Sequence, residues 1–218
     1  MNKNFRYDSV IFDLDGTLLN TLDDLHDAVA HSLAAYGLPA RTLDEVRRFV
    51  GNGIRLLIER SVPEGCPDSV TDSVFEEFKK YYGSHCNDNT KPYDGIIELL
   101  RQLKSCGLSC AIVSNKADFA VKTLAQDYFD GLCAAAIGER DGIRKKPAPD
   151  SVFEAMALLD AKKPVYVGDS EVDIATAKAA GIPCISVSWG FRGKNELISA
   201  GAEVVCESTA ELLSALEA

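Results

Sequence analysis

Short apolar segments that alternate with helix-length stretches constrain the fold of this chain more than any other feature of its sequence. Six such segments span residues 9–14, 109–113, 133–137, 164–167, 183–187 and 202–206. They are almost continuously apolar, which is typical of strands buried on both faces of a parallel sheet. Most of the intervals between them carry apolar residues at helical spacing, as at 96–106, 119–126, 151–159, 174–180 and 209–216. Strands that alternate with helices predict an α/β fold with a parallel sheet.

Residues 19–88 break this alternation and have a helical pattern throughout. Apolar residues recur at helical spacing from Leu22 to Leu33, and Thr42 with Glu45 forms a capping-box pattern at the start of a further helix. We therefore expect an all-helical domain inserted after the first strand. The expected domains are an α/β core of residues 1–18 and 89–218 and a helical domain of residues 19–88.

The charge of the chain limits the partners it can have. With 33 acidic and 23 basic residues, the net charge is -10. Such a chain repels nucleic acid and anionic membranes, so we expect neither as a partner. No apolar run approaches the roughly 20 residues of a membrane helix, and the start of the sequence lacks the apolar stretch of a signal peptide. The seven cysteines are scattered without zinc spacing. We expect a soluble, cytoplasmic protein with reduced thiols, either a monomer or a homodimer.

Two carboxylates follow the first predicted strand. Asp13 and Asp15 are only two residues apart, at the end of an apolar run. Holding both there is costly unless a cation or hydrogen bonds compensate them. Ligands of open α/β sheets bind beyond the carboxyl ends of the strands, where these residues lie. Gly16 allows a sharp turn that brings backbone N–H groups near an anion. An Asp-Gly turn alone would explain Asp15 but not Asp13.

Polar residues also follow the strand predicted at 109–113. Ser114 and Asn115 could donate to a phosphate oxygen from a hydroxyl group and a helix N-terminus. They would equally suit an ordinary helix N-cap. Further along, Lys145 and Lys146 precede Pro147, and a lysine held there can neutralise a phosphate and orient a carboxylate. Lys146 is favoured because it directly precedes the proline, and the sequence does not exclude Lys145.

A second acidic motif follows the strand predicted at 164–167. Asp169 comes directly after Gly168, and Glu171 and Asp173 follow at the expected start of a helix. Acids at a helix N-terminus favour the helix dipole, which would explain Glu171 and Asp173. Magnesium prefers hard oxygen ligands, and one or two carboxylates with waters and a substrate phosphate suffice to bind it. We therefore expect the side chains at 13, 15 and 169 to lie close enough to share one Mg²⁺ ion.

Taken in this order, the four motifs resemble those of the haloacid dehalogenase superfamily. The motifs are D-x-D-G-T-L, S-N, K-P and G-D-S-x-x-D, and the resemblance covers the whole chain. It implies a Rossmann-like core in which the helical insert is a cap domain. The stretches at 20–21, 49–53 and 189–192 look similar to the phosphoglycolate phosphatase-like subgroup. That similarity implies a hydrolase of a small phosphorylated metabolite.

The resemblance also implies a role for each motif residue. Asp13 would be the nucleophile that forms an aspartyl-phosphate, and Asp15 the general acid and base whose backbone carbonyl also binds the metal. Lys146 would be the third catalytic residue. The metal-binding residues would be Asp13, Asp15, Asp169 and Asp173. The phosphate- and substrate-binding residues would be Gly16, Thr17, Ser114, Asn115, Gly51, Asn52 and Gly53.

Several alternatives remain open at this point. Asp15 argues against dehalogenases and phosphonate-cleaving relatives, which replace that residue. Sugar-phosphate mutases of the superfamily keep it, and enzymes that look similar to this chain also act on pyrophosphate. A protein that kept the fold and lost activity would also remain possible, although none of the motif residues is missing. In the insert, Arg47, Arg48 or Arg55 could attract a substrate carboxylate or be solvated helix surface.

Overall fold

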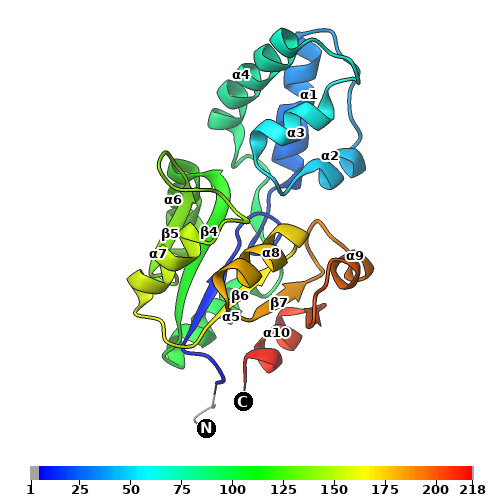
Figure 1. Cartoon of the computed structure of the whole chain (residues 1–218). Coiled ribbons are helices and arrows are strands. Elements are labelled where there is room, and N and C mark those ends of the chain that lie inside the picture. The colour runs from blue at the N-terminus through cyan, green and yellow to red at the C-terminus, as the bar shows by residue number, and fades with distance from the viewer. Residues whose placement is uncertain (1–4, 218) are drawn as a thin grey trace. The chain divides into compact units, whose positions relative to one another are not determined.

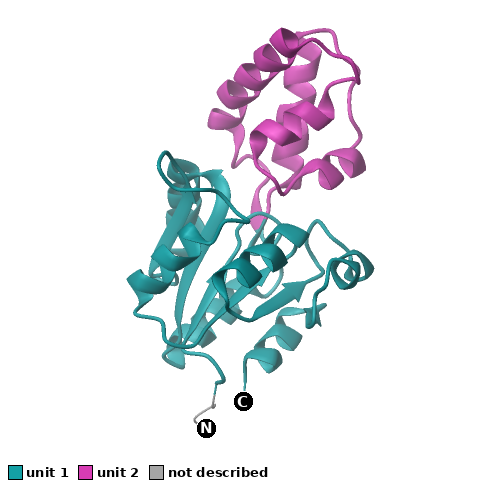
Figure 2. Ribbon diagram, viewed as in Figure 1, with its two compact units in different colours: residues 1–19, 92–218 teal, residues 20–91 magenta. Residues whose placement is uncertain are grey.

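The computed structural model describes residues 5–217 and divides into two compact units (Figure 2). Unit 1 comprises the chain up to Leu19 and from Pro92 onward, and unit 2 spans Asn20–Lys91. The boundaries expected from the sequence, after residues 18 and 88, differ from these by one and three residues. None of the helices within residues 5–217 combines the length and the apolar character that crossing a bilayer requires.

Unit 1 is built on a six-stranded sheet in which every pair of neighbouring strands is parallel (Figure 1). The strands are β1 (Ser9–Phe12), β4 (Ser109–Ala117), β5 (Ala135–Glu139), β6 (Pro164–Gly168), β7 (Cys184–Val187) and β8 (Val205–Cys206). Their order is β5-β4-β1-β6-β7-β8. The chain therefore proceeds from β1 first toward one edge and later toward the other. This reversal beside β1 is the position at which open α/β sheets bind their ligands.

Helices cover both faces of this sheet. They are α5 (Ile96–Ser105), α6 (Asp118–Phe129), α7 (Asp150–Leu159), α8 (Glu171–Ala180), α9 (Lys194–Ser199) and α10 (Thr209–Leu216). Alternate strand residues belong to opposite cores, because side chains of a strand point to opposite faces in turn. Val10 and Phe12 join the core that contains α5, α6 and α10 residues, whereas Ile11 joins the core that contains α7 and α8 residues. The strands are thus apolar throughout because both of their faces are buried.

Unit 2 consists of four helices around its own core. The helices are α1 (Leu22–Ala35), α2 (Leu43–Phe49), α3 (Ile54–Ser61) and α4 (Asp68–His85). Val29, Leu33, Val74 and Phe78 are fully buried in this core. The capping box expected at Thr42 is present, with the Glu45 N–H donating to the Thr42 side chain. The chain enters and leaves the unit through β2 (Leu19–Asn20) and β3 (Lys91–Pro92), which pair as a two-stranded sheet.

The extent of β4 and the presence of α9 differ from the sequence-based expectation. β4 continues through Ser114 and Asn115 to Ala117. The helix predicted at 119–126 is present as α6 and begins at Asp118, so the helix N-terminus suggested at Ser114 and Asn115 is wrong. The short helix α9 had no predicted counterpart. Its six residues are too few to show a helical period.

A buried carboxylate connects the two ends of unit 2. Asp24, in the first turn of α1, is 2% exposed. Its Oδ1 accepts hydrogen bonds from the backbone and side-chain nitrogens of Asn89, at 2.8 and 3.0 Å. Its Oδ2 accepts from the backbone N–H and hydroxyl of Thr90, at 2.9 and 2.6 Å. One side chain thereby joins the beginning of the helical unit to its end.

We expect Asp24→Ala to lower the free energy of unfolding of unit 2 by about 3 kcal/mol, because buried donors lose their acceptor. Native-state hydrogen exchange of amides in α1 and α4 measures this quantity within the full chain. The matched control is Asp23→Ala, at an exposed position in the same helical turn, with an expected change within about 0.5 kcal/mol. Equal protection of the α1 and α4 amides from exchange in both variants would contradict a stabilising role for Asp24.

Candidate active site

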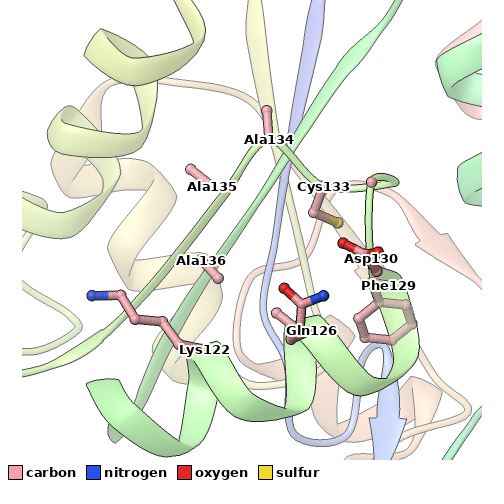
Figure 3. Close-up of a pocket in the computed structure, with 10 residues that line it drawn as sticks. Lys122, Gln126, Phe129, Asp130, Cys133, Ala134, Ala135 and Ala136 are labelled. Atoms are coloured by element: carbon pink, nitrogen blue, oxygen red, sulfur yellow. The ribbon is translucent and has the colours of Figure 1, made fainter.

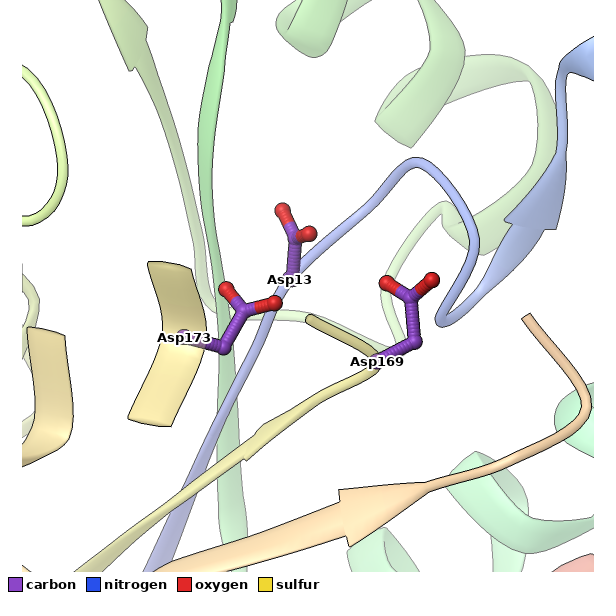
Figure 4. A group of neighbouring side chains, drawn as sticks. All are labelled: Asp13, Asp169 and Asp173. Carbon is purple, nitrogen blue, oxygen red and sulfur yellow. The ribbon is translucent and has the colours of Figure 1, made fainter. Parts of the chain in front are cut away.

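Three carboxylates meet at the carboxyl end of the central strands. Asp13 directly follows β1, Asp169 directly follows β6, and Asp173 lies in the first turn of α8. All three are buried, and each offers an oxygen within 4.8 Å of the others. Figure 4 shows the three carboxyl groups on the same side of the strand ends. Because β1 and β6 are neighbouring parallel strands, residues more than 150 positions apart come together at their carboxyl ends.

Lys146 is the buried cation of this group. Its Nζ lies 2.8 Å from Asp13 Oδ1 and 2.8 Å from Asp173 Oδ1, and it donates to the Tyr166 hydroxyl at 3.1 Å. Lys145 is exposed. The structure therefore brings Lys146, and not Lys145, to the carboxylates.

Asn115 fixes the segment that carries this lysine. Its Nδ2 donates to the Lys146 carbonyl at 3.0 Å, and its Oδ1 accepts from the Lys146 N–H at 2.8 Å. The reciprocal pair ties the loop before α7 to β4. The side chain of Asn115, expected at a phosphate, is thus engaged with the main chain of Lys146. Because β4 continues past Ser114, neither residue lies at the helix N-terminus that the sequence suggested.

Asp169 is held by two donors from separate segments. Thr17 donates from its hydroxyl to Asp169 Oδ1 at 3.1 Å, and the Phe191 N–H donates to Asp169 Oδ2 at 2.7 Å. The fit around this carboxylate is close, since a Cβ at Gly16 would lie 2.3 Å from Asp169 Oδ2. A Cβ at Gly190 would lie 2.1 Å from the Gly16 carbonyl oxygen. Glycine is therefore required at both positions. The Thr17 side chain, expected at a phosphate, contacts Asp169.

Asp173 supports the site from α8. Its Oδ2 accepts from the Ser170 N–H at 3.1 Å and from the Ser170 hydroxyl at 2.6 Å. Its Oδ1 accepts from Lys146 at 2.8 Å and from the Tyr166 hydroxyl at 3.2 Å. Each oxygen of Asp173 thus accepts two hydrogen bonds, whereas each oxygen of Asp169 accepts one. Asp173 therefore positions Lys146 and the loop after β6.

The side chain of Asp15 departs from the expectation that residues 13, 15 and 169 share one ion. Its carboxylate is not part of the group formed by Asp13, Asp169 and Asp173. Instead, Lys116 Nζ lies 3.2 Å from its Oδ1, and the Ser114 hydroxyl donates to its Oδ2 at 3.4 Å. What remains for Asp15 as a metal ligand is its main-chain carbonyl. Lys116 was not among the residues that the sequence motifs pointed to.

The electrostatics of the cluster show a deficit of positive charge. Burial raises the pKa of Asp13 well above its usual value, with Asp173 and Asp169 adding to the shift and Lys146 opposing it. Burial and the nearby Asp173 raise the pKa of Asp169 to about 7, against the donors Phe191 and Thr17. Although burial opposes it, Asp13 and Asp173 hold the pKa of Lys146 well above its usual value. One lysine thus faces three carboxylates.

The donor set fits a divalent cation that prefers oxygen. The clustered atoms are all carboxylate oxygens, and within residues 5–217 no histidine or cysteine joins the group. Hard oxygen donors of this kind suit magnesium rather than zinc or copper. A second positive charge beside Asp13 and Asp169 would also offset the cost of burying them.

The raised pKa of Asp169 predicts how stability depends on pH without a metal. The folded state retains a proton that the unfolded state releases between 3.8 and about 7. Stability conferred by that proton is therefore present below pH 3.8 and is lost as the pH rises to about 7. In a chelator, we expect the free energy of unfolding to fall across this range by a few kcal/mol more in the wild type than in Asp169→Asn. Urea unfolding at several pH values measures the difference, and parallel curves for the two proteins would refute it.

The remaining expected substrate residues belong to unit 2. Gly51, Asn52 and Gly53 connect α2 to α3, and both glycines have positive φ angles, 120° and 88°. These three residues are therefore not part of the carboxylate cluster of unit 1. Of the arginines considered, Arg47 and Arg48 pair with Asp44 at 2.9 and 3.1 Å, and Arg55 pairs with Glu59 at 2.7 Å.

A separate hollow of about 250 Å³ lies between α6 and β5 (Figure 3). Its lining includes Lys122, Gln126, Phe129 and Cys133. Burial raises the pKa of the Cys133 thiol well above its usual value, so this sulfur is not a thiolate nucleophile. The hollow lies at the β5 edge of the sheet and contains none of the carboxylates of the cluster.

Comparisons with known proteins agree with this geometry. Residues 10–187 match the family model described as haloacid dehalogenase-like hydrolase. Over 194 residues, the chain is 37% identical to a phosphoglycolate phosphatase from Mesorhizobium japonicum, with 85% of each chain covered.

Solved structures extend the similarity to the whole fold. A protein from Lactobacillus delbrueckii subsp. bulgaricus, proposed to be a phosphoglycolate phosphatase, matches with a TM-score of 0.92 and 34% identity, over 97% of this chain and 98% of that one. CbbY from Rhodobacter sphaeroides, in complex with phosphate, matches with a TM-score of 0.73 and 26% identity, over 96% of this chain and 99% of that one.

Proposed function

The chain belongs to the haloacid dehalogenase-like hydrolase family, and from this premise we propose that it is a magnesium-dependent phosphatase of small phosphate monoesters. The observation that carries the proposal is the buried cluster of Asp13, Asp169 and Asp173 around Lys146 at the carboxyl end of the sheet. Such a cluster is costly to fold without a function that uses it.

In the proposed reaction, the Asp13 carboxylate attacks the phosphorus atom of the ester and displaces the alcohol. An aspartyl-phosphate forms, and water then releases inorganic phosphate and regenerates Asp13. Asp15 gives a proton to the leaving alcohol and takes one from the attacking water. Lys146, which lies 2.8 Å from Asp13, neutralises charge on the phosphoryl group. The sequence resemblance assigns Ser114, Gly16 and Thr17 to phosphate binding. In the structure their donors contact the protein itself: the two hydroxyl groups donate to Asp15 and Asp169, and the two N–H groups of the turn donate to main-chain carbonyls.

Asp13 and Asp169 would hold Mg²⁺ through their carboxylates, together with the main-chain carbonyl of Asp15, and Asp173 would support them. When bound, the ion supplies positive charge that lessens repulsion between the Asp13 carboxylate and a dianionic phosphate ester. The contacts of Thr17 and Phe191 support this assignment, because they orient Asp169 toward the cluster.

The similarity to the Mesorhizobium japonicum phosphoglycolate phosphatase supports phosphoglycolate as the substrate. We assign unit 2 the role of a cap that selects the substrate, with Gly51, Asn52 and Gly53 approaching it through their backbone. Other small phosphorylated metabolites and pyrophosphate are the competing substrates, and a mutase would move the phosphoryl group instead of releasing it.

The testing experiment is hydrolysis of para-nitrophenyl phosphate with and without Mg²⁺, followed by a substrate screen. We expect turnover with Mg²⁺ and a loss of at least about 100-fold in a chelator. The screen compares phosphoglycolate, nucleoside monophosphates, hexose phosphates and pyrophosphate by kcat/KM, with released phosphate as the readout. Phosphate binding without turnover of any ester would indicate a binding protein, and isomerised sugar phosphate would indicate a mutase.

A further inference from the structure

We propose that Lys116 is a positioning residue that fixes the carboxylate of Asp15 for proton transfer to the leaving alcohol. The inference rests on the proposed phosphatase function, in which Asp15 is the general acid and base. It concerns a residue that none of the four sequence motifs contains.

The geometry of β4 places two donors on Asp15. Lys116 Nζ lies 3.2 Å from Asp15 Oδ1, and the Ser114 hydroxyl donates to Asp15 Oδ2 at 3.4 Å. Ser114 and Lys116 are two residues apart on β4, and both side chains reach the same carboxylate. The Lys116 N–H also donates to the Ser114 hydroxyl oxygen at 3.2 Å, which orients that hydroxyl toward Asp15. Each oxygen of the carboxylate thus has its own donor.

The burial of the pair distinguishes it from an ordinary surface ion pair. The side chain of Lys116 is 4% exposed and that of Asp15 is 17% exposed. Exposed Lys–Asp pairs contribute little and hold no fixed geometry. A buried ammonium group, in contrast, must keep its partner, because losing it leaves an uncompensated charge. Asp15 is therefore held in one orientation.

The two buried lysines of the site serve different carboxylates. Lys146 contacts Asp13 and Asp173, and Lys116 contacts Asp15. This division keeps the carboxylate of Asp15 out of the metal-binding cluster, although only one residue separates it from Asp13. As general acid, Asp15 begins with the transferred proton on one of its oxygens, gives it to the leaving oxygen, and becomes the carboxylate that Lys116 and Ser114 contact. Holding it in place removes the rotational freedom that would otherwise slow the transfer.

The consequence is a dependence on the leaving group. An alkyl alcohol must be protonated as it leaves, whereas para-nitrophenolate leaves without a proton. The ratio kcat/KM reports the steps through departure of the alcohol. The positioning of Asp15 therefore matters to kcat/KM for alkyl phosphates and hardly for para-nitrophenyl phosphate, although the later attack of water uses Asp15 with both substrates. A lysine that bound the phosphoryl group itself would affect both substrates equally.

The experiment measures kcat/KM for para-nitrophenyl phosphate and for the best alkyl phosphate of the screen. We expect Lys116→Met to lower the alkyl value by roughly 100-fold and the para-nitrophenyl value by less than about 5-fold. Lys116→Arg, which retains the charge, should restore at least about a tenth of the alkyl value. The matched control is Lys122→Met, an exposed lysine of α6, with both values unchanged. Thermal unfolding of each variant identifies any that fails to fold.

A double variant separates positioning from other roles. If Lys116 acts through Asp15, Asp15→Asn with Lys116→Met loses no more alkyl activity than Asp15→Asn alone. The inference would be overturned if the losses of the two single variants multiplied in the double variant, or if Lys116→Met lost equal activity on both substrates. The proposed function would stand in either case. Wild-type protein without turnover of any phosphate ester would overturn both.

Discussion

Asp13→Asn is expected to lower the turnover of para-nitrophenyl phosphate by at least about 10⁴-fold, since a neutral amide cannot take up the phosphoryl group. The same substitution removes a buried carboxylate whose pKa is raised by burial and by two neighbouring acids. We therefore expect the metal-free variant to unfold at an equal or higher temperature than the wild type. Phosphate release and thermal unfolding measure the two effects.

Asp160→Asn is the matched control for this substitution. Asp160 has a φ of 50°, in the left-handed region where asparagine is also favourable, and its side chain is 88% exposed. Turnover should stay within about 2-fold of the wild type. Retention of more than about a tenth of the activity by Asp13→Asn would exclude Asp13 as the nucleophile.

Lys146→Met should have a large effect on stability in the opposite direction. The substitution leaves the carboxylates of Asp13 and Asp173 without the ammonium group that lies 2.8 Å from each. Breaking a buried ion pair from one side costs about 3–5 kcal/mol, so we expect the free energy of unfolding to fall by this amount. Turnover should fall by roughly 10³-fold, because the charge on the phosphoryl group also loses its partner. Urea unfolding and steady-state kinetics provide the readouts.

The neighbouring Lys145 is a natural control, since it is exposed and has the same side chain. Lys145→Met should leave both quantities nearly unchanged. If the two variants were equally active and equally stable, Lys146 would neither stabilise the buried carboxylates nor neutralise the phosphoryl group.

The strand pattern of the core was predictable because it follows from burial on both faces. The segments at 9–14 and 164–167 contain β1 and β6, and helix α10 spans the residues expected at 209–216. The extension of β4 through residues 114–117 was not predictable, because polar residues such as Ser114 and Asn115 usually end an apolar strand. Here their side chains are satisfied by Asp15 and by the Lys146 main chain, contacts that only the tertiary structure supplies.

The residues of the candidate site likewise divide into those that the sequence identifies and those that only the structure reveals. Asp13, Asp169 and Lys146 could be found from the sequence because each follows a strand or precedes a proline in a recognisable motif. Tyr166 and Lys116 could not. Tyr166 occupies an ordinary buried strand position and reveals its role only by contacting Lys146 and Asp173. Lys116 follows Ser114 by one strand period, a signal that becomes readable once the strand is known to continue.

The pairing of β2 with β3 has a consequence for the modularity of this chain. The helical unit begins and ends at two strands that lie side by side, and Asp24 joins its two ends internally. An insertion with adjacent ends can be excised and replaced without stretching the polypeptide at the junction. A helical insert of another length, grafted between residues 20 and 91, could therefore be accommodated by the same six-stranded scaffold, which would allow recognition of new esters to be engineered separately from phosphoryl chemistry.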